Sequence, residues 1–226
     1  MAIAFFDLDR TLIRVNSGEL WVGFELRGGR LSRWQAARAA AWIFGYHLGY
    51  TRMEALLEEA IGTLVDQEEV EVRARTRTFY DAEVRQTFRP GALEAIAYHR
   101  AEGHTLALLT SSSTYLSEVV MEQLDIPHAL CNRFEVRDGR FTGRPAGPLC
   151  FGEGKLTHAR QLADALGERL EDAWFYTDSS SDLAVMDLVG HPVAVHPDPR
   201  LRRLAKKRGW PVADWDRTPT SGSASP

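Results

Sequence analysis

The sequence predicts an α/β fold in which a doubly wound parallel sheet is interrupted once by a helical insertion. Short apolar runs recur along the chain, several end directly in Asp or Thr, and helix-compatible segments separate them. Residues 15–87, in contrast, contain no convincing strand and are rich in Ala, Leu, Glu, Arg and Gln. A chain of 226 residues can bury a core large enough for one such domain and its insertion.

The elements follow one another in a regular alternation. Residues Ile3 to Phe6 are apolar and β-favouring, which indicates a buried central strand. After the insertion, Arg89-Pro90-Gly91 indicates a break in the chain before the next helix. The elements predicted beyond it are a helix to about residue 100, a strand over 105–109, a helix over 114–124, a strand over 128–131, a helix opening at 152–155, a strand ending at 178, a helix over 182–189 and a strand over 191–195. This order is Rossmann-like.

Two segments depart from the alternation. Residues 134–142 indicate a hairpin that turns at Asp138-Gly139, beside the main sheet. The end of the chain is rich in Ser, Thr, Pro and Gly, which predicts a mobile tail. The predicted organisation is therefore a core of residues 1–14 and 88–212, a helical cap of residues 15–87 and a tail of residues 213–226.

Asp7 and Asp9 are the most informative residues, because they follow the first apolar strand directly. The negative charges of two carboxylates at the end of a buried strand need compensation. Mg²⁺ suits them because it prefers hard oxygen ligands and leaves room for a phosphate oxygen. The alternative is that both residues only cap a helix. The strand could also turn one of the two side chains away from the other.

Three further segments place polar groups after strands or at helix starts. They contain Thr110 and Ser111 after one strand, Lys155 in Gly152-Glu153-Gly154-Lys155, and Asp178 and Asp182 after another strand. Each has an ordinary interpretation as a helix cap or a solvated side chain. Their order along the chain is more informative than any single member.

Asp-x-Asp-x-Thr, a strand-terminal Thr, a lone Lys and Asp-x-x-x-Asp together resemble the haloacid dehalogenase superfamily. Within it, the chain is most similar to the phosphoserine phosphatase-like branch, over about residues 1 to 212. Arg10 stands where that family usually has Gly or another small residue. The resemblance implies phosphomonoester hydrolysis and a Mg²⁺ cofactor.

The same resemblance implies the roles of individual residues. Asp7 would be the nucleophile that forms an aspartyl-phosphate, and Asp9 the general acid and base. Mg²⁺ would be held by Asp7, by the Asp9 backbone carbonyl and by Asp178. Thr110, Ser111 and Lys155 would bind the phosphoryl oxygens. Asp182 would support the metal site or Lys155.

The substrate depends on the cap, where the pattern is less informative. Phosphoserine phosphatases usually carry an acidic residue after the first motif, and the aligned residue here is Asn16, with Glu19 nearby. Arg14 and Arg52 could bind a leaving group, or could simply keep the surface soluble. Phosphoserine and histidinol phosphate are the leading candidates for a small phosphorylated metabolite, and a phosphocholine-like or sugar phosphate would also fit the core.

Composition bounds the partners and the location. A formal charge of −4 and a pI near 6.0 favour neither nucleic acid nor an anionic membrane. Cys131 and Cys150 are too few for a disulfide framework, and no zinc pattern is present. The chain starts at once with the first strand, so we expect no signal peptide and a cytoplasmic location. The apolar stretch Ala36 to Tyr50 is short for a membrane span, so it indicates a helix inside the cap or a contact between two subunits. We expect a monomer or a homodimer.

Binding proteins form the alternative class. A scaffold of the same fold could take up phosphate on Asp7 without turnover, and Arg10 in the first motif keeps that alternative open. A receiver domain is about half this length and has no helical insertion after its first strand. Asp9 is retained, which favours an active phosphatase over a degenerate one.

Overall fold

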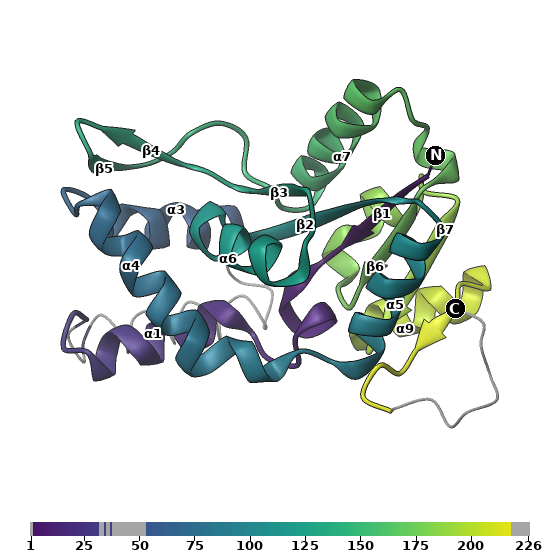
Figure 1. The fold of residues 1–226 in the computed structure, drawn as a ribbon, viewed down its shortest axis with the longest axis horizontal. Coiled ribbons are helices and arrows are strands. Elements are labelled where there is room, and N and C mark those ends of the chain that lie inside the picture. Colours follow the sequence, from purple (N-terminus) through teal and green to yellow (C-terminus); the bar gives the residue numbers. More distant parts are fainter. Residues whose placement is uncertain (1, 32–33, 35–36, 38–52, 218–226) are drawn as a thin grey trace.

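The computed structural model describes residues 2–31, 34, 37 and 53–217. Its core is a six-stranded sheet in the order β3-β2-β1-β6-β7-β8, in which all neighbouring strands are parallel (Figure 1). The strands are β1 (Ile3–Phe6), β2 (Thr105–Ser113), β3 (His128–Asn132), β6 (Trp174–Thr177), β7 (His191–Val195) and β8 (Val212–Ala213). The predicted doubly wound α/β fold is confirmed.

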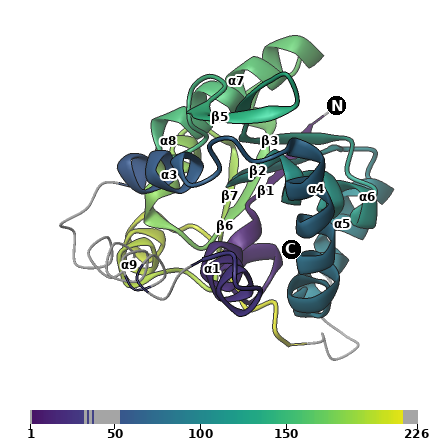
Figure 2. The same ribbon diagram turned by 90° about the vertical axis from the view of Figure 1, so that its left-hand side faces the viewer.

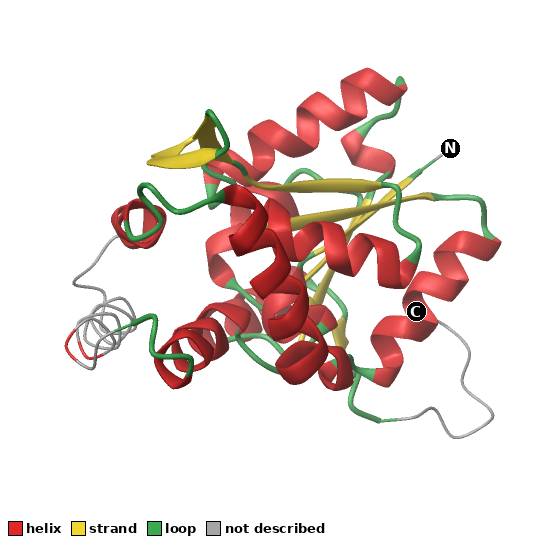
Figure 3. Cartoon of the chain, turned by 60° about the vertical axis from the view of Figure 1, so that its left-hand side comes forward, coloured by secondary structure: helices red, strands yellow, loops and turns green. Residues whose placement is uncertain are grey.

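Helices cover both faces of this sheet (Figure 3). Successive residues of β1 point to opposite faces: Ala4 and Phe6 pack in one buried cluster, and Ile3 and Phe5 in the other. One face is covered by α5 (Pro90–Ala101) and α6 (Thr114–Leu124), and the other by α7 (Glu153–Leu166), α8 (Leu183–Met186) and α9 (Pro199–Arg208). Both faces of β1 are therefore buried, as its continuous apolar run predicts.

The segment predicted as the cap contains α1 (Ser17–Arg27), α3 (Met53–Gly62) and α4 (Glu69–Phe79), followed by helical turns at Tyr80–Val84 and Arg85–Thr87. These helices lie beyond the carboxyl ends of the sheet strands (Figures 1 and 2). An antiparallel bridge between Ile13 and Phe88 joins the two points at which the chain leaves and re-enters the core. The predicted helix within Ala36 to Tyr50 lies outside the described residues, apart from Ala37.

The hairpin forms where the Asp138-Gly139 turn predicts it, with strands β4 (Phe134–Arg137) and β5 (Arg140–Pro145). It makes a two-stranded sheet of its own and contacts the cap. Phe141 packs with Leu64 and Val72 of the cap and with Tyr115 of α6, and its carbonyl accepts a hydrogen bond of 2.9 Å from the Asp66 amide. Burial of an aromatic side chain therefore ties the hairpin to the cap.

The end of the core differs from the prediction of a tail that starts at residue 213. Ala213 pairs with Val195 in the sheet, and Trp215 is 8% exposed and packs against Tyr176. Asp216 forms an ion pair with the buried Arg89. An aromatic side chain and a carboxylate that find buried partners hold this segment on the core, despite its polar neighbours. Residues 218–226 lie outside the described part of the chain.

Two elements differ in length from the prediction. Strand β2 continues through the hydroxyl residues to Ser113, where the Ser113 side chain caps α6. Helix α8 spans only Leu183–Met186 and follows a single helical turn at Ser180–Asp182. Within the described residues, no helix is both long enough and apolar enough to cross a bilayer.

Candidate active site

Parallel strands bring the predicted site residues to one edge of the sheet. In register, Phe6 of β1 lies beside Leu108 of β2 on one side and Tyr176 of β6 on the other. Asp7 follows β1, Thr110 lies two residues beyond Leu108, and Asp178 follows β6. The amide of Asp7 donates a hydrogen bond of 3.0 Å to the Tyr176 carbonyl, which extends this pairing to the carboxyl edge of the sheet.

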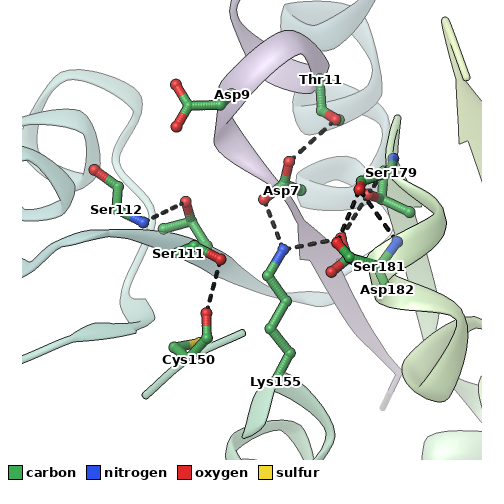
Figure 4. Close-up of polar contacts among 12 residues, drawn as sticks. Asp7, Asp9, Thr11, Ser111, Ser112, Cys150, Lys155, Ser179, Ser181 and Asp182 are labelled. Carbon is green, nitrogen blue, oxygen red and sulfur yellow. Dashed lines mark hydrogen bonds and ion pairs between the residues drawn. The ribbon is translucent and has the colours of Figure 1, made fainter. Parts of the chain in front are cut away.

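Lys155 lies at the centre of the site, with its side chain 3% exposed (Figure 4). Its Nζ donates to Asp7 Oδ1 at 2.8 Å and to Asp182 Oδ2 at 2.9 Å. Burial by itself would lower the pKa of Lys155, but Asp182 and Asp7 outweigh it and hold that pKa above its ordinary value. The ammonium is therefore a permanent positive charge between two carboxylates.

Asp7 is 6% exposed, and burial raises its pKa to about 7 against the opposing effect of Lys155. Burial likewise raises the pKa of Asp178 to about 8, with a further contribution from the charges of Asp7 and Asp182. Thr11 connects two of these groups, since its Oγ1 donates to Asp7 Oδ2 at 3.3 Å and accepts from the Asp178 amide at 2.9 Å. The carboxylates crowd one another beyond what a single ammonium offsets.

These residues fit a divalent cation. Asp182 Oδ1 is buried and has no hydrogen-bond partner, and burial together with the charges of neighbouring carboxylates raises the pKa values of Asp7 and Asp178. Counting Asp9 as well, four carboxylates against one ammonium leave a formal charge of about −3. All the available donors are oxygen atoms, which Mg²⁺ prefers.

Asp9 points away from Asp7 and Lys155 (Figure 4). Its two carboxylate oxygens accept hydrogen bonds from Ser17 instead, at 2.6 Å from the amide and 3.1 Å from the hydroxyl. Burial raises the pKa of Asp9, and the two bonds from Ser17 oppose that rise. The prediction that the end of the strand could turn one of the two Asp side chains away is confirmed.

Thr110 and Ser111 lie on β2 and face different partners. The Thr110 hydroxyl oxygen is buried and accepts from the Ser112 amide at 3.1 Å, which leaves its hydrogen available to donate. Ser111 Oγ donates to the Cys150 carbonyl at 2.8 Å, as Figure 4 shows. The Ser111 side chain therefore holds the loop that leads into α7, and its hydroxyl hydrogen is not available to a phosphoryl oxygen.

Asn132 was not identified from the sequence, although it organises the same loop. Its Nδ2 donates to the Ser111 carbonyl at 2.6 Å, and its Oδ1 accepts from the Cys150 amide at 2.7 Å. The loop precedes Lys155, so Asn132 helps to position the ammonium. A polar residue at the end of the predicted strand over 128–131 was the only available signal.

Of the residues predicted to bind the substrate, the two that the structure describes have other partners. Arg14 forms an ion pair of 2.7 Å with Asp216, at the end of the core. Asn16 is the N-cap of α1 and accepts from the Glu19 amide at 3.0 Å. Arg52 lies outside the described residues. Capping and ion pairing thus explain two of these three residues without a ligand.

Arg10 adopts a left-handed backbone conformation, with φ of 58°. Such a conformation favours Gly or Asn, in agreement with the small residue usual at this position. Its guanidinium forms an ion pair of 3.0 Å with Glu19 of α1, and the backbone carbonyl accepts from Arg89 at 3.2 Å. Arg10 is therefore accommodated with its guanidinium against Glu19 of α1.

Comparison with known proteins identifies the family. The model of the haloacid dehalogenase-like hydrolases matches residues 4–187, which include all the motifs described above. The chain belongs to this family. The sequence-based identification is confirmed, and the protein is a phosphatase of the phosphoserine phosphatase-like branch.

Relatives support this assignment. The phosphoserine phosphatase SerB1 of Mycobacterium tuberculosis is 30% identical over 95% of this chain and 71% of its own length. A histidinol-phosphatase of Neisseria meningitidis is 28% identical over 94% of this chain and 98% of its own. A solved structure from Bordetella pertussis, a protein of unknown function, is 32% identical with a TM-score of 0.88 and covers 95% of this chain and 98% of its own. This phosphatase therefore has relatives named for two different substrates.

Proposed function

We propose that this phosphatase is a Mg²⁺-dependent phosphomonoester hydrolase that works through an aspartyl-phosphate on Asp7. The observation that carries the proposal is the buried Lys155 ammonium, which lies between Asp7 and Asp182 with Asp178 close by. The arrangement aims positive charge at the place where a phosphoryl group would meet the Asp7 carboxylate.

In the first step, an Asp7 oxygen attacks phosphorus, and the bond between phosphorus and the leaving oxygen breaks. Asp9 gives its proton to that oxygen, so the leaving group departs as an alcohol. In the second step, water attacks the phosphorus of the aspartyl-phosphate, and Asp9 takes a proton from the water. The Asp7–phosphorus bond then breaks, inorganic phosphate leaves, and both carboxyl groups return to their starting states.

Other residues hold the phosphoryl group during both steps. The Thr110 hydroxyl has a hydrogen available for its oxygens, the Ser111 amide would add a second donor, and Lys155 neutralises the charge that develops on them. Asp182 keeps Lys155 in place and itself accepts a hydrogen bond of 2.6 Å from Thr177. The phosphoryl group is therefore held by donors that the fold positions before the substrate arrives.

Mg²⁺ would be held by the carboxylates of Asp7 and Asp178 and by the backbone carbonyl of Asp9. When bound, it reduces the repulsion between these carboxylates and an incoming phosphate. The raised pKa values of Asp7 and Asp178, to which burial and the charges of neighbouring carboxylates contribute, support this assignment.

A small phosphorylated metabolite is the proposed substrate, with phosphoserine and histidinol phosphate as the leading candidates. Both names come from relatives of this chain. Both compounds also carry an ammonium group on the leaving side.

The test measures phosphate release from a panel of phosphomonoesters, with Mg²⁺ and with a chelator. The panel includes phosphoserine, histidinol phosphate, a phosphocholine-like compound and a sugar phosphate. We expect release only with Mg²⁺, and we expect Asp7→Asn to fold normally and release none. Intact-protein mass spectrometry of Asp9→Asn should detect a phosphoryl group bound to the chain.

Two outcomes would contradict the proposal. Wild-type rates in Asp7→Asn would exclude Asp7 as the nucleophile. Phosphate taken up on Asp7 without release from any compound would instead favour a phosphate-binding scaffold of the same fold.

A further inference from the structure

Arg89, at the point where the chain re-enters the core, binds the loop that follows β1 in two places. Its backbone amide donates to the Leu12 carbonyl at 2.9 Å, and its guanidinium Nη2 donates to the Arg10 carbonyl at 3.2 Å. Arg89 is only 6% exposed, so water competes little for these bonds. The loop that carries Asp7 and Asp9 is therefore held by a residue that lies 79 positions beyond Arg10 in the chain.

The backbone of Arg10 needs such support, because its conformation is one that a side chain disfavours. Its φ is 58° and its ψ is −3°, in the left-handed region. A residue other than glycine persists in this region where the surrounding contacts fix it. The Arg10 amide donates to the Val15 carbonyl at 3.0 Å, and the Arg10 carbonyl accepts from Arg89. Arg89 thus supplies one of the two bonds that hold this backbone on either side.

The peptide bond between Asp9 and Arg10 connects this conformation to the proposed metal site. In a planar trans peptide, the carbonyl of one residue and the amide of the next point in opposite directions. Since the Arg10 amide points to the Val15 carbonyl, the Asp9 carbonyl points the other way. The Asp9 carbonyl is one of the proposed Mg²⁺ ligands, so contacts that fix the Arg10 backbone also fix the direction of this ligand.

Asp216, near the end of the described chain, compensates the charge of the buried Arg89. Its Oδ2 accepts from Arg89 Nη1, and its Oδ1 accepts from Arg14 at 2.7 Å. Burial raises the pKa of Asp216, but hydrogen bonds from Arg14 and Arg89 outweigh it and leave that pKa below its ordinary value. The segment is itself fixed, because the Trp215 carbonyl accepts from the Gly91 amide at 3.0 Å. The Arg89 guanidinium is therefore held between the end of the core and the loop after β1.

We propose that Arg89 is a positioning residue for the Asp9 carbonyl, and that Asp216 holds Arg89 in place for this task. The inference rests on the proposed function, in which that carbonyl binds Mg²⁺. Arg89 acts on the ligand through the Arg10 backbone. Replacing a residue that orients a metal ligand in this way weakens metal binding about 10–100-fold. Mg²⁺ affinity should therefore depend on a guanidinium and a carboxylate that do not bind the metal themselves.

The test measures the Kd for Mg²⁺ by isothermal titration calorimetry, without substrate, for the wild type and Arg89→Lys. Lysine keeps the positive charge beside Asp216, but its single ammonium does not reproduce the forked contact of a guanidinium. We expect the Kd to rise about tenfold or more. Phosphate release should need correspondingly more Mg²⁺ to reach half its maximal rate. At saturating Mg²⁺, kcat should lie within about threefold of the wild type, because the positioned ligand is then occupied in both proteins.

Arg140→Lys is the matched control. Arg140 also donates to a backbone carbonyl, that of Asp66 at 2.6 Å, and to a carboxylate, that of Glu68, but it lies on the hairpin. Its replacement should leave the Kd for Mg²⁺ unchanged. If Arg89→Lys does not fold, Asp216→Asn takes its place, because it keeps the size of the side chain and removes the charge that holds Arg89. We expect that variant to raise the same Kd by about threefold or more.

An unchanged Kd for Mg²⁺ in the variant that folds would overturn the inference. A lower free energy of unfolding in urea, together with a wild-type Kd, would show a merely structural role and overturn it as well. A wild type that binds no Mg²⁺, or that releases phosphate equally well in a chelator, would instead overturn the Mg²⁺ dependence of the proposed function, and this inference with it.

Discussion

Replacing Lys155 with Met tests whether the ammonium compensates the buried carboxylates. The substitution keeps the length of the side chain and removes contacts of 2.8 Å and 2.9 Å to Asp7 and Asp182. Removing one partner of a buried ion pair destabilises a protein by about 3–5 kcal/mol. Asp182 keeps its bond from Thr177, and Asp7 keeps the longer one from Thr11. We therefore expect a loss near the lower end, about 3 kcal/mol at pH ~8.

The loss should depend on pH. Without Lys155, the folded-state pKa of Asp7 rises further above its ordinary value of 3.8, so the folded variant binds more protons than the unfolded chain. Its free energy of unfolding then falls as pH rises from about 4 through that folded-state pKa. At pH ~5.5 Asp7 is protonated, and the difference from the wild type should be smaller.

Urea unfolding followed by tryptophan fluorescence, in the presence of a chelator, measures both effects. The matched control is Lys206→Met on the exposed face of α9, which should change the free energy of unfolding by less than about 0.5 kcal/mol. Added Mg²⁺ should recover part of the loss in Lys155→Met. A loss below about 1 kcal/mol at pH ~8 would refute the reasoning, because it would mean that Asp7 and Asp182 do not need the ammonium.

Three further predictions concern Asp9, Trp215 and His99. Asp9→Asn should slow both phosphoryl transfer and hydrolysis of the aspartyl-phosphate by about 10²–10⁴-fold, and rapid-quench kinetics that show either step unchanged would reject its double role. Trp215→Ala should lower the free energy of unfolding by about 3–5 kcal/mol, whereas a mobile tail would lose almost nothing. Burial, with charge from His104 and His191, lowers the pKa of His99 from 6.5 to about 4, so His99 should contribute a fall of about 3 kcal/mol to the free energy of unfolding as pH falls across that interval. His99→Phe should lack this fall, and equal slopes in the two proteins would contradict the assignment.

Much of the site was predictable because local sequence fixes where strands end. The apolar run before Asp7 and the run before Asp178 each deliver their carboxylate to the carboxyl edge of a parallel sheet. The run that leads to Thr110 does the same for a hydroxyl. Once the strands are parallel, these groups must meet, whatever the intervening loops do.

Contacts between distant segments were not predictable in this way. Asn132 and Cys150 are paired through a loop whose path depends on the whole fold. Arg14 looked suitable for a leaving group, but tertiary packing brings Asp216 to it from 202 residues away. A charged side chain pairs with an opposite charge that the fold brings near it, and the neighbouring residues in the sequence do not predict which charge that is.

The sequence by itself determined the parallel sheet, the helical composition of the described cap segment and the order of the catalytic motifs, because apolar periodicity and strand-end residues act locally. Only the tertiary structure decided that residues 213–216 join the core, that the hairpin contacts the cap and that Ser17 holds Asp9. Each of these depends on burial shared by segments far apart in the chain. Such burial is a property of the packed molecule, and no local pattern encodes it.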